Sequence, residues 1–139
     1  MIKLLLDDKE ERTPYNIYCY MKDPEYLQDD WRIVRNYDEF VNFITDLYDK
    51  AGIIPSVISF DHDLADEHYV DTILGNFDYN NVKEKTGKCC AEWFVYFCMD
   101  NNLDPLSVKI LVHSMNPVGS ANIRSVFNTY KKLKDRGII

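Results

Sequence analysis

Three short and almost wholly apolar runs constrain the fold of this chain more than any other feature. They cover residues 2–6, 57–60 and 108–112, and each of them ends abruptly in polar residues. Runs of this length without polar alternation are typical of parallel strands that helices cover on both faces. A fourth run, 31–35, alternates and carries charged residues, which fits a strand at the edge of a sheet.

Helical patterns separate these runs. Asn36 predicts the start of an amphipathic helix that Gly52 ends, and the apolar stretch 91–99 predicts a buried helix before a strand at 107–112. A last helix is expected after Pro117, with basic residues near its end. Right-handed crossovers between such elements predict a three-layer α/β sandwich around a parallel sheet of four to five strands, in the order 2-1-3-4.

Three other segments lack a clear period. Residues 9–30 contain two prolines and scattered tyrosines, and they predict a long loop with a single helical turn. The polar stretch 62–86 is expected to be a loop that could cover the strand ends, and residues 138–139 are expected to form a vestigial final strand.

Composition limits the class of protein. At 139 residues with 46% hydrophobic content, the chain is expected to form one domain, 1–139, with a core of its own. A formal charge of -7 disfavours binding to duplex nucleic acid but leaves a small phosphorylated ligand open. There is no apolar run of membrane-spanning length and no signal-like start, so we expect a cytoplasmic protein. The four cysteines lack paired spacing and are expected to be reduced thiols.

Acidic residues follow two of the apolar runs. Asp7 and Asp8 end the first run, and Asp61 and Asp63 follow the run 57–60. In open α/β sheets the carboxyl ends of parallel strands meet at one crevice, so these carboxylates are expected to lie close together and to repel one another. Either a raised pKa or a hard divalent cation, Mg²⁺ or Mn²⁺, offsets such repulsion, and nearby histidines leave Zn²⁺ open. The alternative is that the aspartates only cap loops.

The run 108–112 ends in a second kind of polar cluster. His113, Ser114, Asn116 and Gly119 stand just before the expected last helix. A helix N-terminus with small polar residues offers N–H groups and a positive dipole to a phosphate, and a histidine there can move a proton. Plain capping of the helix by Asn116 is the structural alternative.

Weaker candidates for a phosphate contact lie elsewhere. Thr86 precedes the buried helix in a Thr-Gly-Lys sequence that is too short for a P-loop. Arg12 and Arg124 are candidate guanidinium forks, although most surface arginines are merely solvated.

The residues that carry a family resemblance are spread over nearly the whole chain: Leu6-Asp7-Asp8 with Arg12 and Pro14, Ile58-Ser59-Phe60-Asp61-His62-Asp63-Leu64, Thr86-Gly87, and Val112-His113-Ser114-Met115-Asn116-Pro117 with Gly119 and Asn122. This set resembles the cyclic-phosphate-processing receiver-like domain family. The resemblance implies a receiver/flavodoxin-like fold with an acidic metal pocket. It also implies processing of cyclic or nucleotide-derived phosphates in RNA repair or in conflicts between bacteria and phage.

The family is similar to the receiver domains of two-component signalling. On that resemblance Asp7 and Asp8 match the metal-binding pair, Asp61 matches the phosphoacceptor, and Ser114 falls near the switch hydroxyl. A receiver also places a lysine at the end of a fifth strand, for which we expect no equivalent here. Together with the added histidines, this departure favours chemistry on a diffusible ligand over a phosphotransfer switch.

The leading hypothesis is a metal-dependent phosphoesterase in which Asp7, Asp8 and Asp61 hold Mg²⁺ or Mn²⁺. The expected catalytic residues are Asp61, His113 as acid or base, and Asp63 or His62 to orient water. The expected phosphate contacts are Ser114, Asn116, Gly119, Arg12, Thr86 and Asn122. Two alternatives stay open: a non-catalytic module that sequesters a cyclic nucleotide-type signal, and an atypical receiver phosphorylated on Asp61.

Overall fold

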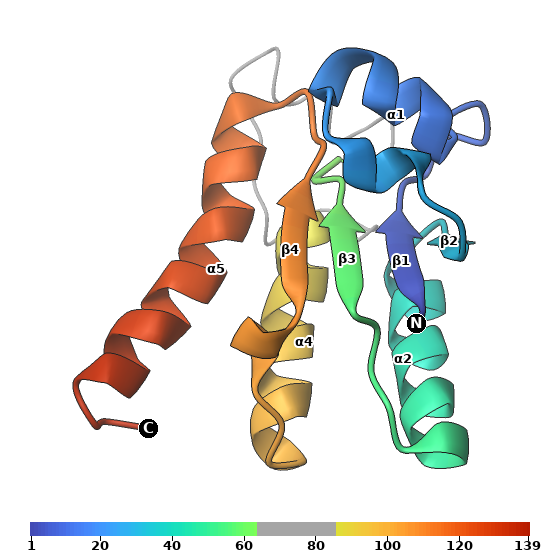
Figure 1. The fold of residues 1–139 in the computed structure, drawn as a ribbon. Helices are drawn as coiled ribbons and strands as arrows, with labels where there is room; N and C mark the ends of the chain where they lie inside the picture. Colours follow the sequence, from blue (N-terminus) through green and yellow to red (C-terminus); the bar gives the residue numbers. More distant parts are fainter. Residues whose placement is uncertain (64–85) are drawn as a thin grey trace.

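A parallel sheet forms the centre of the molecule (Figure 1). The computed structural model describes residues 1–63 and 86–139. Within this part of the chain the sheet has four strands, in the order β2-β1-β3-β4. Their bounds are β1 Lys3–Leu6, β2 Trp31–Val34, β3 Val57–Phe60 and β4 Lys109–Val112. The predicted parallel sheet and its order are confirmed.

The register brings all four strands to an end at the same level. Leu6 of β1 lies opposite Val34 of β2 and Phe60 of β3, and Phe60 in turn lies opposite Val112 of β4. All residues of the two central strands are buried, which explains why their sequences show no polar alternation. The residues that directly follow the strands therefore share one edge of the sheet.

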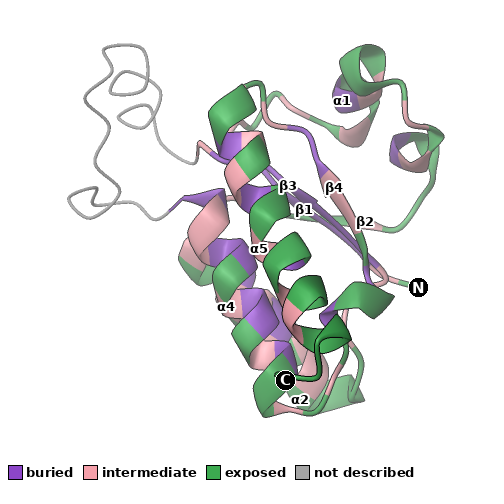
Figure 2. Cartoon of the chain, turned by 90° about the vertical axis from the view of Figure 1, so that its left-hand side faces the viewer, coloured by how far each residue is buried: buried purple, intermediate pink, exposed green. Residues whose placement is uncertain are grey.

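The helices form two unequal layers, as Figures 1 and 2 show. Helices α2 (Tyr37–Ala51), α4 (Gly87–Asp100) and α5 (Pro117–Asp135) cover one face. On the other face, the described part of the chain places only the short helix α1 (Pro14–Met21) and the 3₁₀ turn η1 (Pro24–Leu27). A second 3₁₀ turn, η2 (Pro105–Ser107), precedes β4. The three-layer α/β class is thus confirmed, with one thin outer layer.

The caps of α2 are those that the sequence predicts. The Asn36 side chain accepts a hydrogen bond from the Glu39 N–H at 2.9 Å, and the Glu39 carboxylate accepts one from the Arg35 N–H at 3.1 Å. Gly52 then ends the helix at φ 68°, in the left-handed region that suits glycine.

The expectation of a long loop with one turn over residues 9–30 is wrong. Helix α1 occupies eight of these residues, and η1 follows it. Thr13 accepts a hydrogen bond from the Asn16 N–H, and Pro14 fills the first helical position. The same pairing of a cap and a proline, Asp23 with Pro24, begins η1. Proline at this position costs no hydrogen bond, so both prolines mark helix starts rather than loop.

Two helix ends also differ from expectation. α4 begins at Gly87, before the apolar run, because the Thr86 side chain accepts a hydrogen bond from the Cys89 N–H. Residues 138–139 do not form a strand. Gly137 has φ 73°, and the Ile138 N–H donates to the Leu133 carbonyl, so the chain closes off α5 instead of joining the sheet.

The main core lies between the sheet and the thick helical layer. Phe60 packs against Phe40 of α2 and Phe127 of α5, with ring centroids 5.6 and 5.9 Å apart. Cys90 and Cys98 are buried in the same cluster as small apolar side chains, and no disulfide joins any of the four cysteines, all of which are described. Because Phe127 reaches Phe60, α5 belongs to the same layer as α4.

The thin layer has its own small core. Leu5, Ile17 and Tyr26 form it, and Tyr26 stacks on Trp31 at a centroid distance of 5.6 Å. Below it, the Glu25 carboxylate pairs with the ammonium groups of Lys3 at 3.0 Å and Lys109 at 3.4 Å. These contacts fix η1 on the sheet.

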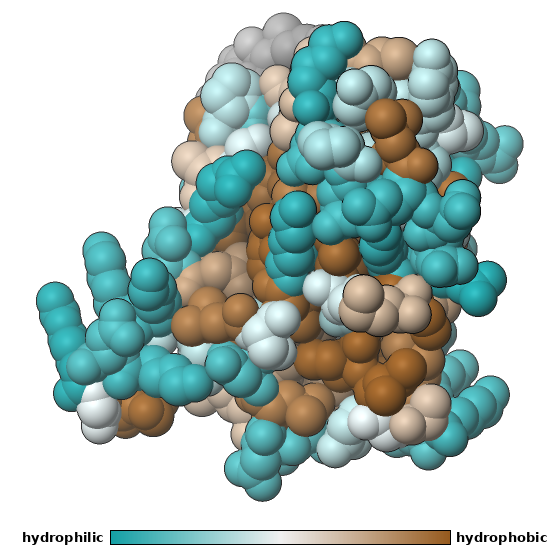
Figure 3. Space-filling model, in the orientation of Figure 1, coloured by the Kyte–Doolittle hydropathy of each residue, from teal (hydrophilic) through white to brown (hydrophobic). Residues whose placement is uncertain are grey.

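The surface reflects this uneven cover. Figure 3 shows hydrophobic residues between α5 and the strands and towards the lower end of the view, which is the amino-terminal end of the strands. Exposed apolar side chains include Ile53, Leu106 and Ile139. Among the described helices, none is long and apolar enough to cross a membrane. The expected loop 62–86 lies outside the described residues except at its two ends.

Candidate functional site

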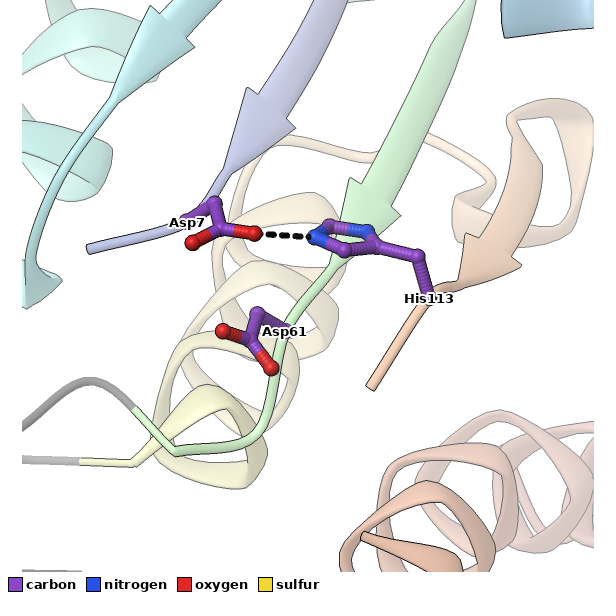
Figure 4. A group of neighbouring side chains, drawn as sticks. All are labelled: Asp7, Asp61 and His113. Carbon is purple, nitrogen blue, oxygen red and sulfur yellow. Dashed lines mark hydrogen bonds and ion pairs between the residues drawn. The ribbon is translucent and has the colours of Figure 1, made fainter. Parts of the chain in front are cut away.

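Three polar side chains meet where the neighbouring strands β1, β3 and β4 end. Asp7 follows β1, Asp61 follows β3, and His113 follows β4. Each offers one ligand atom, and these atoms lie within 4.8 Å of one another. Figure 4 shows the imidazole of His113 directed at the Asp7 carboxylate, with Asp61 beside the pair. Asp7 and His113 are fully buried and Asp61 is 3% exposed, so the group lies inside the sheet edge rather than on its surface.

Asp7 is surrounded by hydrogen-bond donors. Its Oδ1 accepts from the Lys9 N–H at 2.9 Å, and its Oδ2 accepts from His113 Nε2 at 3.0 Å. Arg12 Nη1 donates to the same Oδ2 at 3.4 Å. Burial by itself raises the pKa of Asp7, but the hydrogen bonds from His113 and Lys9 outweigh it and leave the pKa below its usual range. Asp7 is therefore a carboxylate at neutral pH.

Asp61 differs from Asp7 in its protonation state. Burial, and after it the negative charge of Asp7, raise the pKa of Asp61 to about 8. Arg12 Nη1 lies 3.5 Å from its Oδ2 and offsets only part of this effect. Asp61 therefore keeps its proton at neutral pH unless further positive charge enters the site.

Arg12 bridges the two acids. Burial lowers the pKa of its guanidinium, but the charges of Asp7 and Asp61 reverse the shift and raise that pKa above its ordinary value. Its side chain is 29% exposed, so the group reaches both the buried acids and the solvent. Arg12 was predicted as a phosphate contact, and the structure places it against the carboxylates.

Asp8 lies beside this group but is not part of it. The cluster that could hold a metal ion consists of Asp7, Asp61 and His113, so His113 stands where the sequence predicted Asp8. The Asp8 Oδ1 atom is buried and has no hydrogen-bond partner within the described ranges. Burial raises the pKa of Asp8, and the charge of Asp7 adds to that shift. A buried oxygen without a donor is what a cation would satisfy.

His113 makes contacts that the sequence does not announce. Its Nδ1 lies 2.7 Å from Ser59 Oγ, and Ser59 Oγ lies 2.7 Å from the Tyr26 hydroxyl. The Tyr20 hydroxyl donates to the His113 carbonyl at 3.1 Å. Sequence reasoning missed these partners, although Ser59 is the polar residue within the apolar run 57–60. Burial lowers the pKa of His113, so its imidazole is neutral at physiological pH.

His62 and Asp63 lie to one side of Asp7, Asp61 and His113, which form the central group of the site. His62 is buried, and its Nδ1 is 2.9 Å from Asp63 Oδ1. The Asn116 amide donates to Asp63 Oδ2 at 3.3 Å. Gly119 allows the ring of His62 to pack on α5, because a Cβ at that position would lie 2.3 Å from His62 Cγ. This close approach explains the glycine without a ligand.

The predicted phosphate donors of α5 are engaged in local structure. Asn116 Oδ1 accepts from the Gly119 N–H at 3.1 Å, which makes Asn116 the cap of the helix. Ser114 Oγ accepts from the Asn116 N–H at 3.1 Å. Asn122 is half-buried on the same helix, and Thr86 caps α4. The structural alternative of capping is thus observed, whereas phosphate contacts at these residues stay predictions.

Comparison with known proteins adds one finding. A family model for the cyclic-phosphate processing receiver domain matches residues 2–129. No curated protein and no solved structure matches the chain. The match takes in all four strands, the helices up to the last turns of α5, and every residue of the central group. The chain belongs to the family of cyclic-phosphate processing receiver domains.

Proposed function

We propose that the chain is a metal-dependent phosphoesterase that hydrolyses a cyclic phosphate or another nucleotide-derived phosphate. The observation that carries the proposal is the buried group of Asp7, Asp61 and His113, with Arg12 in contact with both carboxylates. In the reaction, water would add to phosphorus and one ester P–O bond would break. The oxygen that leaves would take up a proton, and a phosphomonoester would be released.

The acidic residues fit a divalent cation. Asp7 and Asp61 would hold it, with Asp8 beside them, because the unpartnered Asp8 Oδ1 and the raised pKa of Asp61 both mark a shortage of positive charge. Carboxylates suit both Mg²⁺ and Mn²⁺. When bound, such an ion polarises the phosphate and lowers the pKa of a coordinated water.

The side chains divide the remaining work. The part of Arg12 that faces solvent would bind phosphate oxygens through its planar fork of N–H groups. His113 would hold or release a proton at Nε2, which lies 3.0 Å from Asp7 Oδ2. Asp63, held by His62 and Asn116, would orient water at the edge of the group.

The remaining contacts are secondary in this scheme. Capping hydrogen bonds already engage the Ser114 hydroxyl, the Asn116 side chain and the Gly119 N–H. In this scheme a phosphate would contact these residues only through polar atoms that are not used in capping. Thr86 and Asn122 would line the approach. The ligand would be a small phosphorylated or cyclic nucleotide, and a cytoplasmic role in RNA repair or phage conflict belongs to the same proposal.

Two substitutions test this function. We expect the wild-type chain with Mn²⁺ or Mg²⁺ to hydrolyse a member of a panel of 2′,3′-cyclic nucleotides and ADP-ribose cyclic phosphates, and EDTA to abolish the reaction. Asp61→Asn and His113→Gln should each lower kcat by about 100-fold or more, since each removes a charge or proton carrier from the group. Asp49→Asn, the same change at an exposed site on α2, is the matched control. Wild-type rates in both site variants would contradict the proposal.

A non-catalytic binding module is the second candidate. One observation favours it: both ring nitrogens of His113 already have hydrogen-bond partners, Ser59 and Asp7. Calorimetry with the same panel, followed by chromatography of the recovered ligand, separates the two candidates. Intact ligand after long incubation with metal supports sequestration, and an acid-labile phosphate on Asp61 after treatment with acetyl phosphate supports a receiver instead.

A further inference from the structure

A buried chain of hydrogen bonds runs behind the central group. The Tyr26 hydroxyl lies 2.7 Å from Ser59 Oγ, Ser59 Oγ lies 2.7 Å from His113 Nδ1, and His113 Nε2 lies 3.0 Å from Asp7 Oδ2. Ser59, His113 and Asp7 are fully buried, and Tyr26 is 2% exposed. The four residues come from η1, β3 and the ends of β4 and β1. The row of hydrogen bonds therefore runs across the face of the sheet that α1 and η1 cover.

The donors around Asp7 decide the direction of every bond in this chain. Asp7 accepts from the Lys9 N–H and from Arg12 Nη1, neither of which can accept a hydrogen bond. Asp7, held as a carboxylate by these donors, has no proton of its own to give, so His113 Nε2 is the donor to its Oδ2. The neutral imidazole then has no proton on Nδ1, which must accept from Ser59. Ser59 Oγ in turn accepts from the Tyr26 hydroxyl, and each proton in the chain has one place.

The order Ser59–His113–Asp7 is that of a serine hydrolase, but the surroundings of Ser59 exclude a nucleophilic role. Its side chain is fully buried within β3, and the ring of Tyr26 covers it from η1. Tyr26 also packs edge-on against His113, with ring centroids 6.4 Å apart. A phosphate could not reach Ser59 Oγ without displacing Tyr26, so the hydroxyl serves the imidazole and not a substrate.

We propose that Ser59 and Tyr26 are positioning residues that hold His113 in the tautomer with its proton on Nε2, directed at Asp7 and the proposed phosphate site. Because Nδ1 is occupied by the hydrogen bond from Ser59, His113 exchanges a proton with the site through Nε2. The significance of this tautomer for catalysis rests on the proposed phosphoesterase function. The tautomer itself does not, because it follows from the hydrogen bonds of a buried, neutral imidazole beside a carboxylate.

The tautomer can be observed directly by nuclear magnetic resonance on the full chain labelled with ¹⁵N histidine, with His113→Gln to identify the signals. We expect the proton on Nε2 and a hydrogen-bonded, unprotonated Nδ1. In Ser59→Ala the Nδ1 signal should move to the position of a free acceptor, whereas Ser59→Thr, which keeps the hydroxyl, should restore it. A proton on Nδ1 in the wild type, or an Nδ1 signal that is the same in Ser59→Ala, would overturn the proposal.

Tyr26→Phe provides a graded variant. Ser59 keeps its own proton in this variant and can still donate to Nδ1, so a shift smaller than that of Ser59→Ala is expected. A shift as large as that of Ser59→Ala would contradict the order of the chain. If Ser59→Ala does not fold, the wild-type tautomer together with Ser59→Thr and Tyr26→Phe still decides the question.

Kinetics separate positioning from mere support of the fold. Ser59→Ala should lower kcat about tenfold or more with little change in KM, and Ser59→Thr should recover most of the rate. Ser56→Ala is the matched control, because Ser56 stands just before β3, at the end away from the site, where its hydroxyl donates to the Ile2 carbonyl. A full rate in folded Ser59→Ala would refute the positioning role. If the wild type hydrolyses nothing in the panel, the proposed function fails, while the resonance measurement still confirms or overturns the tautomer.

Discussion

At the scale of single residues, the site is organised by two buried aspartates in different charge states. The donors around Asp7 hold it as a carboxylate, whereas burial and the charge of Asp7 leave Asp61 protonated near neutral pH. Two adjacent acids with separated pKa values are typical of sites that move protons or bind cations. Arg12 contacts both acids and partly neutralises them, so the pair is prepared for added positive charge.

The raised pKa of Asp61 predicts an unusual dependence of stability on pH. The folded state keeps the Asp61 proton up to about pH 8, whereas the unfolded chain loses it near the ordinary value of 3.8. Between these values the folded state binds the extra proton, so the free energy of unfolding should fall as pH rises, by at most about 1.4 kcal/mol per pH unit. The pKa of His113 is lowered from its ordinary value of 6.5, so this group affects the slope below that pH and adds little to it between pH 6.5 and 8.

Urea unfolding of the metal-free protein at several values between pH 6.5 and 8 measures this slope. Asp61→Asn cannot ionise, so it should remove the decrease, whereas Asp49→Asn should retain it. Equal slopes in the wild type and Asp61→Asn would show that Asp61 is ionised in the folded protein.

Arg12 should matter through the shape of its side chain as well as its charge. Arg12→Gln should raise KM, or Kd for a binding module, by about tenfold or more, because the solvent-facing fork to the phosphate is lost. Arg12→Lys keeps the charge but not the planar geometry, and it should recover only part of the affinity. Arg32→Gln on the exposed edge strand is the control, and an unchanged KM in Arg12→Gln would remove Arg12 from the ligand site.

At the scale of elements, the close fit between α5 and the end of β3 shapes the site. Gly119 brings the first turn of α5 onto the ring of His62, and Asn116 caps the same turn while it donates to Asp63. In a similar way, Gly87 lets α4 start against the backbone of Asp61, where a Cβ would lie 1.9 Å from the Asp61 carbonyl oxygen. Two helix starts therefore hold the segment that carries Asp61 and His62.

Gly119→Ala tests the first of these contacts. The added methyl would overlap the His62 ring, so the ring or the first turn of α5 must move. Overpacking of this kind costs about 1–3 kcal/mol, although alanine has the better helix propensity. Denaturant unfolding should show this loss, and Asn128→Ala at an exposed position of α5 should leave stability nearly unchanged. A more stable Gly119→Ala variant would mean that the contact is loose.

The elements also show where the sequence was informative. The two central strands were predictable because their residues are buried on both faces, and α2 because Asn36 and Gly52 mark its ends. Helix α1 was missed because Ile17 is its one buried residue, so its sequence shows no clear apolar face, and because its Thr13-Pro14 start also fits a loop. For the same reason Tyr26, in the turn after α1, could not be placed beside Ser59 from sequence alone.

At the scale of the whole molecule, the topology brings the strand ends together and the unequal layers determine what lies behind them. The order β2-β1-β3-β4 places β1, β3 and β4 side by side, so Asp7, Asp61 and His113 could be predicted as neighbours. The layer of α2, α4 and α5 forms the apolar core, whereas η1 in the other layer contributes Tyr26 to the hydrogen-bond chain that reaches His113. That division depends on where α5 packs, which no local pattern in the sequence reveals.

Anomalous diffraction from crystals grown with Mn²⁺ and phosphate tests the central claim most directly. We predict a manganese peak between the carboxylates of Asp7 and Asp61, with Arg12 turned from the acids toward the phosphate. The same experiment on Asp61→Asn should lose the peak. Absence of manganese from the wild-type site at millimolar metal, with Arg12 still bridging the two aspartates, would contradict a metal-dependent site and leave Arg12 and the aspartates as structural ion pairs.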